Sequence, residues 1–369
     1  MTGAPMRALY VLPSGADGPD TRLLWHLLAR LPAVGVAPSL CFLVDGPVRE
    51  RWTSALEGAR GRALAPAGRR VSERRAIVGV AEAIRAAEAR IVHSIGPEAH
   101  IAASRAAKRA GVPMVWTQTG IAAWGRLREL RAAWSPAGAV LLHTAAGAHA
   151  QHRVNVWRRP CRVIAPGVGL PERLREHRQA DARAGLGLPA SGIVAASVGP
   201  FGATACHERF LSAGASLCHA RAAARLIVAG TSGDPGDLGA RAAALGLGDV
   251  TTLVEPARLA AALDAADIVF HGDAGEAQVP VALLEALASG AAVVAEPSQL
   301  VREVVADGAT AVFTPPDHEA LAVALLALAD DTRLRTSLGA AGAATAREHF
   351  DADRMAIDVR ALYRELVGA

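Results

Sequence analysis

The amino-acid sequence predicts an α/β protein with two domains, each a doubly wound parallel sheet covered by helices on both faces. Two observations predict this class. Short continuous apolar runs alternate with helical segments rich in Ala, Arg and Leu, which is typical of parallel strands buried on both faces. The pattern also restarts after a polar stretch, and 369 residues suit about two domains.

In the first half of the chain, the expected strands are apolar runs that end at turn signals. Pro13-Ser14-Gly15 stops the first run, and Gly111-Val112-Pro113 ends a helix and precedes a strand. The expected strands are Ala8–Leu12, Ser39–Val44, Arg90–His93, Met114–Thr117, Ala139–His143 and Arg162–Ile164. The expected helices are Asp20–Leu31, Val71–Glu88 and one that follows Pro97 and ends at Arg109.

The stretch Pro171–Gly192 carries Pro, Gly and many charges, so we expect an interdomain linker with a short helix there. We divide the chain into a first domain at 1–170, a second at 171–350, and a C-terminal helix at 351–369 that packs back toward the first domain. The strands expected in the second domain are Ile193–Val198, Arg225–Ala229, Val250–Val254, Ile268–Phe270, Ala292–Ala295 and Ala311–Phe313. The helices expected after the linker are Glu208–His219, Leu238–Leu245, Leu259–Ala265, Val281–Ser289 and Ala352–Val367.

Composition excludes several classes of protein. A hydrophobic content of 51% excludes wholesale disorder. The net charge of +4 comes from arginines interspersed with acids, without the aromatic-interleaved basic stripe of a nucleic-acid binder. The four cysteines are scattered, and we find neither a signal peptide nor an apolar run long enough to span a membrane. These features predict a cytoplasmic protein.

Three phrases of the second half carry a family resemblance: Ala266–Phe270, Val281–Ala295 and Arg302–Gly308. Together with Ala110–Thr117 and Val163–Val168 in the first half, they make the chain resemble the nucleotide-sugar-dependent glycosyltransferases of family 4, also called group 1. The resemblance covers almost the whole chain. It implies the GT-B fold, in which two Rossmann-like domains face a central cleft, with the donor on the second domain and the acceptor on the first.

A helix expected to begin at Pro280 and Val281 is the main candidate for the donor site. The free N–H groups of a helix N-terminus suit a diphosphate. The resemblance implies that Glu285, on this helix, binds the two ribose hydroxyls of the donor; alternatively Glu285 caps or pairs with a neighbour. The resemblance also places Gly15, Gly199 and Gly230 in loops near the donor, although turns need glycine in any case.

A second acid of the family motif falls at an unusual spacing. The family pattern is Glu-x7-Glu, which puts Ala277 at the first position, whereas Glu276 gives Glu-x8-Glu. A one-residue insertion in the loop would make Glu276 a contact to the donor sugar, and a loop tolerates such an insertion. Otherwise Glu276 is an ordinary loop acid.

The loop between Ser197 and His207 lacks the cations that the resemblance leads us to expect. Pro200 and Ala205 stand where family members have Arg and Lys, and Lys108 is the only lysine of the chain. A departing diphosphate needs cationic or dipolar stabilisation. His207, when protonated, or Arg209 could supply part of it; alternatively Arg209 is a solvated helix residue.

Two positions of the first domain are candidates for contact with the reaction centre. Thr119 stands where the family usually has a histidine, and its hydroxyl can bind a sugar but cannot shuttle a proton as imidazole does. His93 ends an expected strand. It is either an acceptor contact or a buried, hydrogen-bonded histidine.

These residues predict a glycosyltransferase that moves a sugar from a UDP- or GDP-sugar to a glycan, lipid-linked or small-molecule acceptor. By resemblance the reaction is retaining and needs neither a metal nor a prosthetic group. The departures from the motif suggest an alternative, an inactive GT-B protein that acts as a partner subunit or sugar-nucleotide binder. A nucleotide-sugar epimerase would need acids and histidines that we do not find. The segment Trp124–Trp134, with three arginines, suggests weak peripheral contact at the inner face of a membrane.

Overall fold

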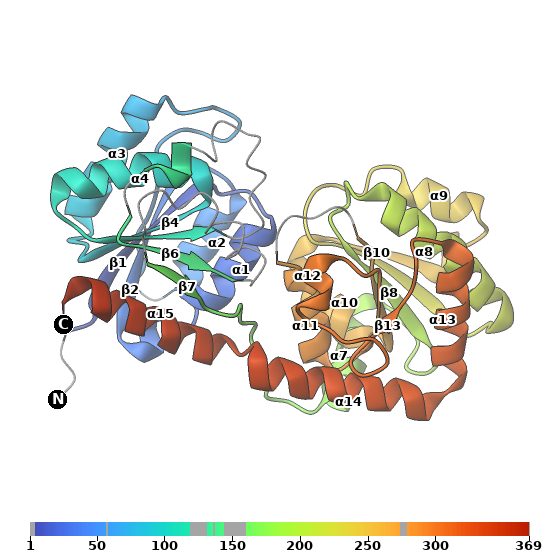
Figure 1. Ribbon diagram of the computed structural model, residues 1–369. Helices are drawn as coiled ribbons and strands as arrows, with labels where there is room; N and C mark the ends of the chain where they lie inside the picture. Colours follow the sequence, from blue (N-terminus) through green and yellow to red (C-terminus); the bar gives the residue numbers. More distant parts are fainter. Residues whose placement is uncertain are drawn as a thin grey trace. The chain divides into compact units, whose positions relative to one another are not determined.

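The structure is a computed structural model that describes residues 4–56, 58–118, 131–135, 137–143, 160–273 and 279–368 (Figure 1). The chain forms two compact units. Unit 1 contains the chain up to Gly167 together with the stretch from Ala352 onward, and unit 2 lies within Val168–Asp351.

Unit 1 is built on a seven-stranded sheet in the order β3-β2-β1-β4-β5-β6-β7, and every strand pair in it is parallel. Strand β1 pairs with β2 on one side and with β4 on the other, so the chain reverses its direction of travel across the sheet between β1 and β4. The strands are β1 (Met6–Ser14), β2 (Val36–Val44), β3 (Gly61–Ala63), β4 (Ile91–Ile95), β5 (Met114–Gln118), β6 (Ala139–Leu142) and β7 (Cys161–Val163).

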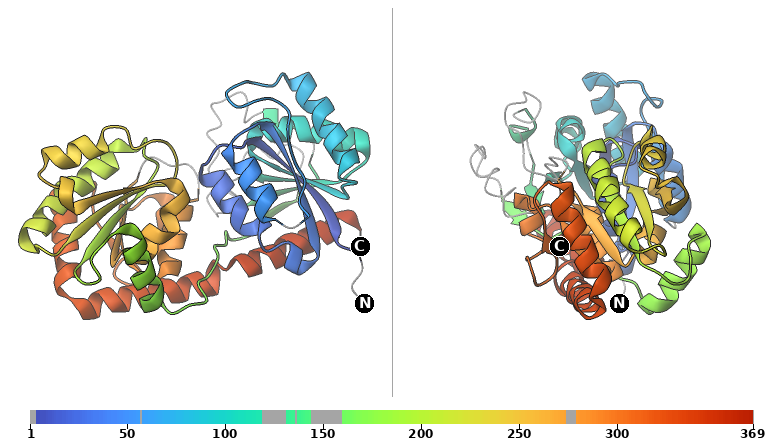
Figure 2. Two further views of the ribbon diagram at one scale, coloured as in Figure 1. Left: turned by 180° about the vertical axis from the view of Figure 1, so that it is seen from behind. Right: turned by 90° about the vertical axis from the view of Figure 1, so that its right-hand side faces the viewer.

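Helices cover both faces of this sheet (Figures 1 and 2). Helices α3 and α4 pack together on one face over a core that includes Leu9, Val11 and Val92. Helix α1 contacts α15, the last helix of the chain. The helices of unit 1 that lie wholly within the described residues are α1 (Pro19–Leu28), α2 (Pro47–Ala55), α3 (Glu73–Ala86), α4 (Gly96–Ala110), α15 (Ala352–Val367) and the short 3₁₀ turn η1 (Pro32–Val34).

Unit 2 has a six-stranded parallel sheet in the order β10-β9-β8-β11-β12-β13. Here the reversal lies between β8 and β11, which pair with each other in the middle of the sheet. The strands are β8 (Val194–Gly199), β9 (Arg225–Gly230), β10 (Thr251–Val254), β11 (Ile268–His271), β12 (Ala292–Ala295) and β13 (Val312–Phe313).

Helices α8, α9 and α13 of unit 2 pack together, and α7, α10, α11 and α14 form a second connected group (Figure 1). Phe210 of α8 stacks on Phe270 of β11 inside the core of the first group. The helices are α7 (Arg175–Leu186), α8 (Thr204–Ala220), α9 (Leu238–Ala244), α10 (Leu259–Ala265), α11 (Val281–Ser289), α12 (Gln299–Arg302), α13 (His318–Asp330) and α14 (Thr332–His349), with 3₁₀ turns η2 (Gly248–Val250) and η3 (Pro256–Arg258).

The predicted fold class, two Rossmann-like parallel-sheet domains, is confirmed, and each predicted strand is present. Strand β3 and helices α2, α12, α13 and α14 were not predicted, and α7 is a longer helix than the one expected in the linker. Helix α14 contains Gly339 and Gly342, which weaken helix propensity. They serve packing, because a Cβ on Gly339 would come within 2.2 Å of the Gly290 oxygen and one on Gly342 within 2.9 Å of Leu287.

The loops after β1 and β2 touch through glycine. A Cβ on Gly46 would lie 2.3 Å from the carbonyl carbon and oxygen of Gly15, and one on Gly15 would lie 2.8 Å from the Gly46 nitrogen. Gly15 N–H donates to the Val44 carbonyl at 3.0 Å, and Val48 N–H donates to the Gly15 carbonyl at 3.0 Å. The backbone contact between two loops therefore accounts for Gly15, which the sequence analysis assigned to the donor site.

This contact gives a first prediction. Gly46 and Gly18 are both N-cap residues with extended backbone, at φ of −178° and 178°, but a Cβ on Gly18 meets nothing within 4 Å. We expect Gly46→Ser to destabilise unit 1 by about 2–3 kcal/mol through overpacking. Gly18→Ser should be neutral or slightly stabilising, because serine is a good N-cap. Urea unfolding followed by tryptophan fluorescence measures this, since all six tryptophans lie before residue 168. Equal stability of the two variants would contradict the prediction.

Candidate functional site

The strand reversal of unit 2 marks the candidate donor site. In doubly wound sheets ligands bind outside the carboxyl ends of the strands, where the strand order reverses. Strand β8 ends there at Gly199 and β11 ends at His271. The helices that follow these two strands are α8 and α11, so their N-terminal turns flank this edge.

Helix α11 begins after a proline N-cap and carries a single half-buried acid. Its N-cap is Pro280, whose side chain makes no capping hydrogen bond. Every other residue of α11, from Val281 to Ser289, is buried, whereas Glu285 is half-buried. A helix N-terminus without a side-chain cap offers N–H donors to an anion. The placement of Pro280, Val281 and Glu285 thus suits the roles that the resemblance implies.

Arg209 is held by a buried acid that the sequence analysis missed. Its Nε donates to Glu296 Oε1 at 2.6 Å and its Nη2 donates to Oε2 at 3.0 Å. The Glu296 side chain is 3% exposed and also accepts the Asp273 backbone N–H at 2.8 Å. Arg209 is therefore neither a solvated helix residue nor an unengaged cation. Its bidentate pair joins α8 to the loops that follow β11 and β12.

His207 does not supply the missing positive charge. It is fully buried, with Ser197 Oγ 2.9 Å from Nδ1 and the Pro200 carbonyl 3.2 Å from Nε2. Burial lowers the pKa of His207 more than its hydrogen bonds to Pro200 and Gly199 raise it. The ring is therefore neutral near pH 7, which corrects the expectation that a protonated His207 could compensate for the absent Arg and Lys.

Gly199 and Gly230 end neighbouring strands. A Cβ on Gly230 would come within 2.2 Å of the Phe201 ring, so packing requires glycine there. A Cβ on Gly199 would meet only the His207 ring, at 3.9 Å. Thr231 N–H donates to the Gly199 carbonyl at 2.8 Å, which ties the two loops together. Phe201 therefore gives Gly230 a structural reason that is independent of a ligand.

In unit 1, His93 lies inside a chain of buried polar groups. Its Nδ1 is 2.5 Å from Tyr363 Oη and its Nε2 is 2.5 Å from Thr117 Oγ1. Burial and the neighbouring His143 lower the pKa of His93 to about 3. With 0% exposure and both nitrogens bonded, His93 has no atom left for an acceptor. The arrangement matches the second of its two expected roles, a buried hydrogen-bonded histidine.

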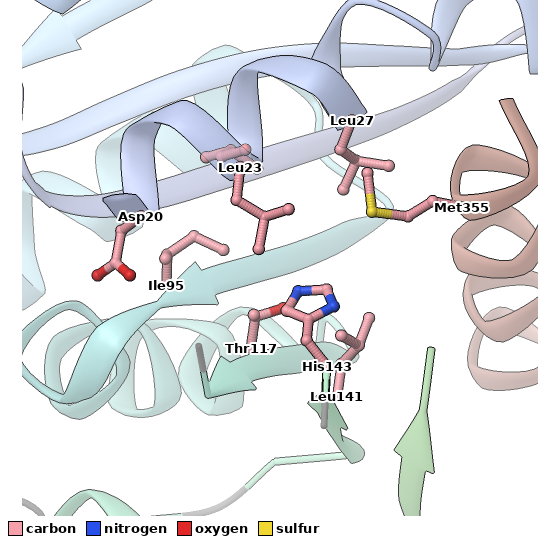
Figure 3. Close-up of a pocket in the computed structure, with 9 residues that line it drawn as sticks. Asp20, Leu23, Leu27, Ile95, Thr117, Leu141, His143 and Met355 are labelled. Atoms are coloured by element: carbon pink, nitrogen blue, oxygen red, sulfur yellow. The ribbon is translucent and has the colours of Figure 1, made fainter. Parts of the chain in front are cut away.

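A small pocket with a cavity volume of about 10 Å³ lies at the carboxyl ends of β4, β5 and β6 (Figure 3). The residues that line it are Asp20, Leu23, Leu24, Leu27, Ile95, Thr117, Leu141, His143 and Met355. From the sequence, Thr117 and His143 were named only as the last residues of two expected strands. The available signal was their position, because both lie at the carboxyl end of an apolar run.

Some predicted residues lie outside the described parts of the chain. These are Glu276, Thr119 and most of Trp124–Trp134. Of that last segment, Arg131 pairs with Glu73 at 2.8 Å and Trp134 is 54% exposed. Within the described residues no helix is both long and apolar enough to cross a membrane, and no cluster of three or more His, Cys, Asp or Glu side chains is placed to hold a metal ion.

Comparison with known families identifies unit 2. Residues 178–345, from α7 to α14, match the model of the family described as glycosyl transferases group 1. The chain carries a group 1 glycosyltransferase domain. That domain contains α11, Glu285 and the Arg209–Glu296 pair. No curated protein matches the sequence.

Solved structures resemble the whole chain, including the group 1 domain. HepE of Anabaena, in complex with UDP and glucose, superposes with a TM-score of 0.78 at 18% identity, over 98% of this chain and 100% of HepE. Sucrose-phosphate synthase of Thermosynechococcus elongatus superposes with a TM-score of 0.72 at 17% identity, over 98% of this chain and 99% of the synthase chain. A putative UDP-N-acetylglucosamine 2-epimerase of Listeria monocytogenes superposes with a TM-score of 0.70 at 13% identity, over 98% of this chain and 96% of the epimerase chain. At these identities the likeness establishes the GT-B fold and does not separate transferases from epimerases.

The Arg209–Glu296 pair of the group 1 domain gives a second prediction. Removing one partner of a buried pair leaves the other charge uncompensated, so Arg209→Met should destabilise unit 2 by about 3–5 kcal/mol. Adding Glu296→Gln should recover more than half of that loss. Arg221→Met is the control, because its partner Asp330 is 52% exposed, and it should cost under about 1 kcal/mol. Urea unfolding followed by circular dichroism measures all three. A loss for Arg209→Met as small as the control's would refute the prediction.

His93 gives a third prediction, for pH dependence. Its folded pKa of about 3 lies below the 6.5 of a free histidine, so the unfolded chain takes up a proton first as the pH falls. The free energy of unfolding of unit 1 should therefore drop between pH 6.5 and 3, by up to about 1.4 kcal/mol per pH unit from His93. His93→Gln should remove that part of the slope, whereas His318→Gln, at an exposed position, should not. Tryptophan fluorescence reports the slope, and parallel slopes for wild type and His93→Gln would sink the idea.

Proposed function

We propose that this protein is a glycosyltransferase that uses a nucleotide-diphosphate sugar as donor and binds it through unit 2. The observation that carries the proposal is the group 1 match over residues 178–345, which runs through the β11–α11 segment at the strand reversal. The N-terminus of α11, whose N-cap Pro280 makes no side-chain capping bond, supports a diphosphate site, and the half-buried Glu285 supports a contact to the ribose. By resemblance, we also propose a retaining reaction without a metal ion.

UDP is the first nucleotide to test. HepE of Anabaena has been crystallised with UDP and with UDP-glucose, and it is similar to this chain along its whole length. GDP is the second nucleotide to test, because it carries the alternative base, guanine. The acceptor is a glycan, a lipid-linked group or a small molecule, and Glu276 and Thr119 stay candidates for contacts to the sugars.

A second candidate function, an inactive sugar-nucleotide binder or partner subunit, is favoured by the charges of unit 2. Pro200 and Ala205 leave the loop after β8 without a cation, His207 is neutral, and Arg209 is bound to Glu296. Departure of the diphosphate would then rely on backbone dipoles. This candidate predicts binding without transfer.

We propose that the protein works in the cytoplasm. Its four cysteines are all free thiols, as a reducing compartment favours. The 54% exposure of Trp134 supports weak contact with the inner face of a membrane.

A calorimetric titration of the purified chain with UDP, GDP and ADP gives the fourth prediction. We expect one of them to bind at micromolar strength, and Glu285→Ala to weaken that binding at least about tenfold by removing a charged acceptor of hydroxyl hydrogen bonds. The control Glu348→Ala, whose side chain is 74% exposed, should bind as wild type does.

The outcomes separate the candidates. Binding of a nucleotide followed by release of UDP from UDP-glucose, insensitive to EDTA, supports the metal-independent transferase. Binding without turnover supports the inactive binder. Failure of every nucleotide to bind a folded protein overturns the transferase and the sugar-nucleotide binder, and leaves the partner subunit.

A further inference from the structure

The last carbonyl group of α11 lies away from solvent and is bonded to two arginines. The last carbonyls of any helix have no N–H partner within it. Ser289 ends α11 and is only 4% exposed, so its carbonyl oxygen has little access to water. Arg175 Nη1 donates to that oxygen at 2.7 Å, and Arg178 Nη2 donates to it at 3.0 Å. Because a carbonyl oxygen has two lone pairs, the two guanidinium groups of α7 satisfy it fully.

Arg175 also bonds to the start of the chain segment that α11 ends. Its Nη2 donates at 2.6 Å to the carbonyl of Ala266, which lies just before β11. One guanidinium group therefore links the chain entering β11 to the chain leaving α11. Helix α7 packs against α10, and α10 packs against α11 (Figure 1). Since a guanidinium is planar and rigid, its two hydrogen bonds hold the two carbonyls at a set separation.

Arg175 differs in its partners from the other two arginines of α7. Arg178 forms an ion pair with Asp264, and Arg183 forms one with Asp267 at 2.7 Å. Among the described residues, the hydrogen bonds of Arg175 go to backbone carbonyls alone. Burial lowers the pKa of Arg175 to about 10, so the side chain is still positively charged near pH 7. A positive charge at the C-terminal end of a helix complements the negative end of its dipole.

Two kinds of contact hold α11 in unit 2. Along its side, α11 packs against α14, where a Cβ on Gly342 would come within 2.9 Å of Leu287. At its C-terminal end, Gly290 has a φ of 79°, and a Cβ there would lie 3.3 Å from Arg175 Cδ. Apolar packing is non-directional, whereas hydrogen bonds require a set distance and angle. The arginine bonds at Ser289 therefore fix the position of α11 along its own axis.

We propose that Arg175 is a positioning residue of the donor site, holding α11 along its axis so that Glu285 and the first N–H groups of the helix meet the nucleotide. The inference rests on the proposed function, which assigns α11 to the donor. Helix α11 has nine residues and is about 13 Å long, so Arg175 acts from the end opposite to the proposed diphosphate site. Binding groups must be held to within about 0.5 Å, so a small slide of α11 would weaken both contacts.

Calorimetric titration of the full chain with UDP tests the proposal. Arg175→Met keeps an unbranched side chain but removes both hydrogen bonds, so we expect UDP to bind about tenfold more weakly, the equivalent of one lost hydrogen bond. Arg175→Lys keeps a charge that can reach one of the two carbonyls, so it should recover part of the loss. GDP and ADP are titrated in parallel, so that the nucleotide compared is the one that wild type prefers.

Two control variants remove arginines that, among the described residues, make no hydrogen bond to α11. Arg183→Met removes hydrogen bonds from the same helix, α7, to carbonyls outside α11, including that of Ala265. Arg335→Met removes hydrogen bonds to the last carbonyls of another helix, α13, including that of Leu328. Both variants should lower the free energy of unfolding and still bind UDP as tightly as wild type does. Circular dichroism at the titration temperature establishes that each variant is folded.

Hydrogen exchange gives a readout that needs no nucleotide. Since Arg175 is proposed to fix α11, Arg175→Met should speed the exchange of the amide hydrogens of α11 at least about tenfold more than that of α8, which lies in the same unit. A role in overall stability alone would speed exchange in both helices by the same factor. Arg183→Met, as the control, should not favour exchange in α11 over α8.

A double variant tests whether the arginine acts through the helix. The loss of UDP affinity in Arg175→Met/Glu285→Ala should be smaller than the product of the two single losses, because both changes weaken the same contact. Multiplicative losses would contradict an action of Arg175 through Glu285.

The outcomes separate this inference from the proposed function. UDP affinity that is unchanged in Arg175→Met, or that falls equally in the two controls, would overturn the positioning role, and so would equal acceleration of exchange in α8 and α11. Failure of the folded wild type to bind any nucleotide would instead overturn the proposed function and the link to a donor. The exchange comparison would then still decide whether Arg175 holds α11 in place.

Discussion

Two tyrosine hydroxyls that meet inside unit 1 hold its parts together. Tyr10 lies in the first strand and Tyr363 in the last helix, and their oxygens are 2.5 Å apart with both side chains fully buried. His93 and Thr117 continue the chain of bonds. Each buried hydroxyl would cost about 1–3 kcal/mol if left without a partner, so α15 is fixed in one position by polar as well as apolar contacts. Met355 on that helix then forms one wall of the pocket.

In unit 2 the buried acid Glu296 is already paired with a cation, Arg209. Glu296 takes both guanidinium contacts of Arg209 and the N–H of Asp273, so this part of the strand edge is held together but neutralised. A diphosphate bound at α11, as proposed, would meet the N-terminal dipole of that helix, whereas Arg209, the one arginine of α8, is already paired with Glu296. The proposed site therefore offers a helix dipole for binding but no unpaired arginine of α8 for the departure of a diphosphate. Catalysis would require the ion pair to exchange partners or the backbone to carry the charge.

Much of the fold could be predicted from the sequence, because most buried parallel strands are continuous apolar runs, and every strand except the short β3 was found within a few residues. Helix α13 was missed because its segment His318–Asp330 is apolar on nearly every side and shows little helical periodicity. The site was less predictable. Arg209 and Glu296 are 87 residues apart in sequence, so only the fold brings them together. Gly230 looked like a ligand loop, yet the Phe201 ring already requires glycine there.

One rule would have found more of the polar residues. In a parallel sheet the residues at and just beyond the carboxyl ends of the strands gather at one edge. His143 follows β6, Glu296 follows β12 and His271 ends β11, and each is a polar residue directly after an apolar run. Sequence alone places each of them at that edge of its own sheet. It cannot say whether a neighbouring group provides the hydrogen-bond partner. For His143 the carbonyl of Ile164, from the loop after β7, settles the proton on one nitrogen and leaves the other as an acceptor. The protonation pattern of His143 is therefore set by a backbone carbonyl at the end of the adjacent strand. No local sequence pattern encodes that contact.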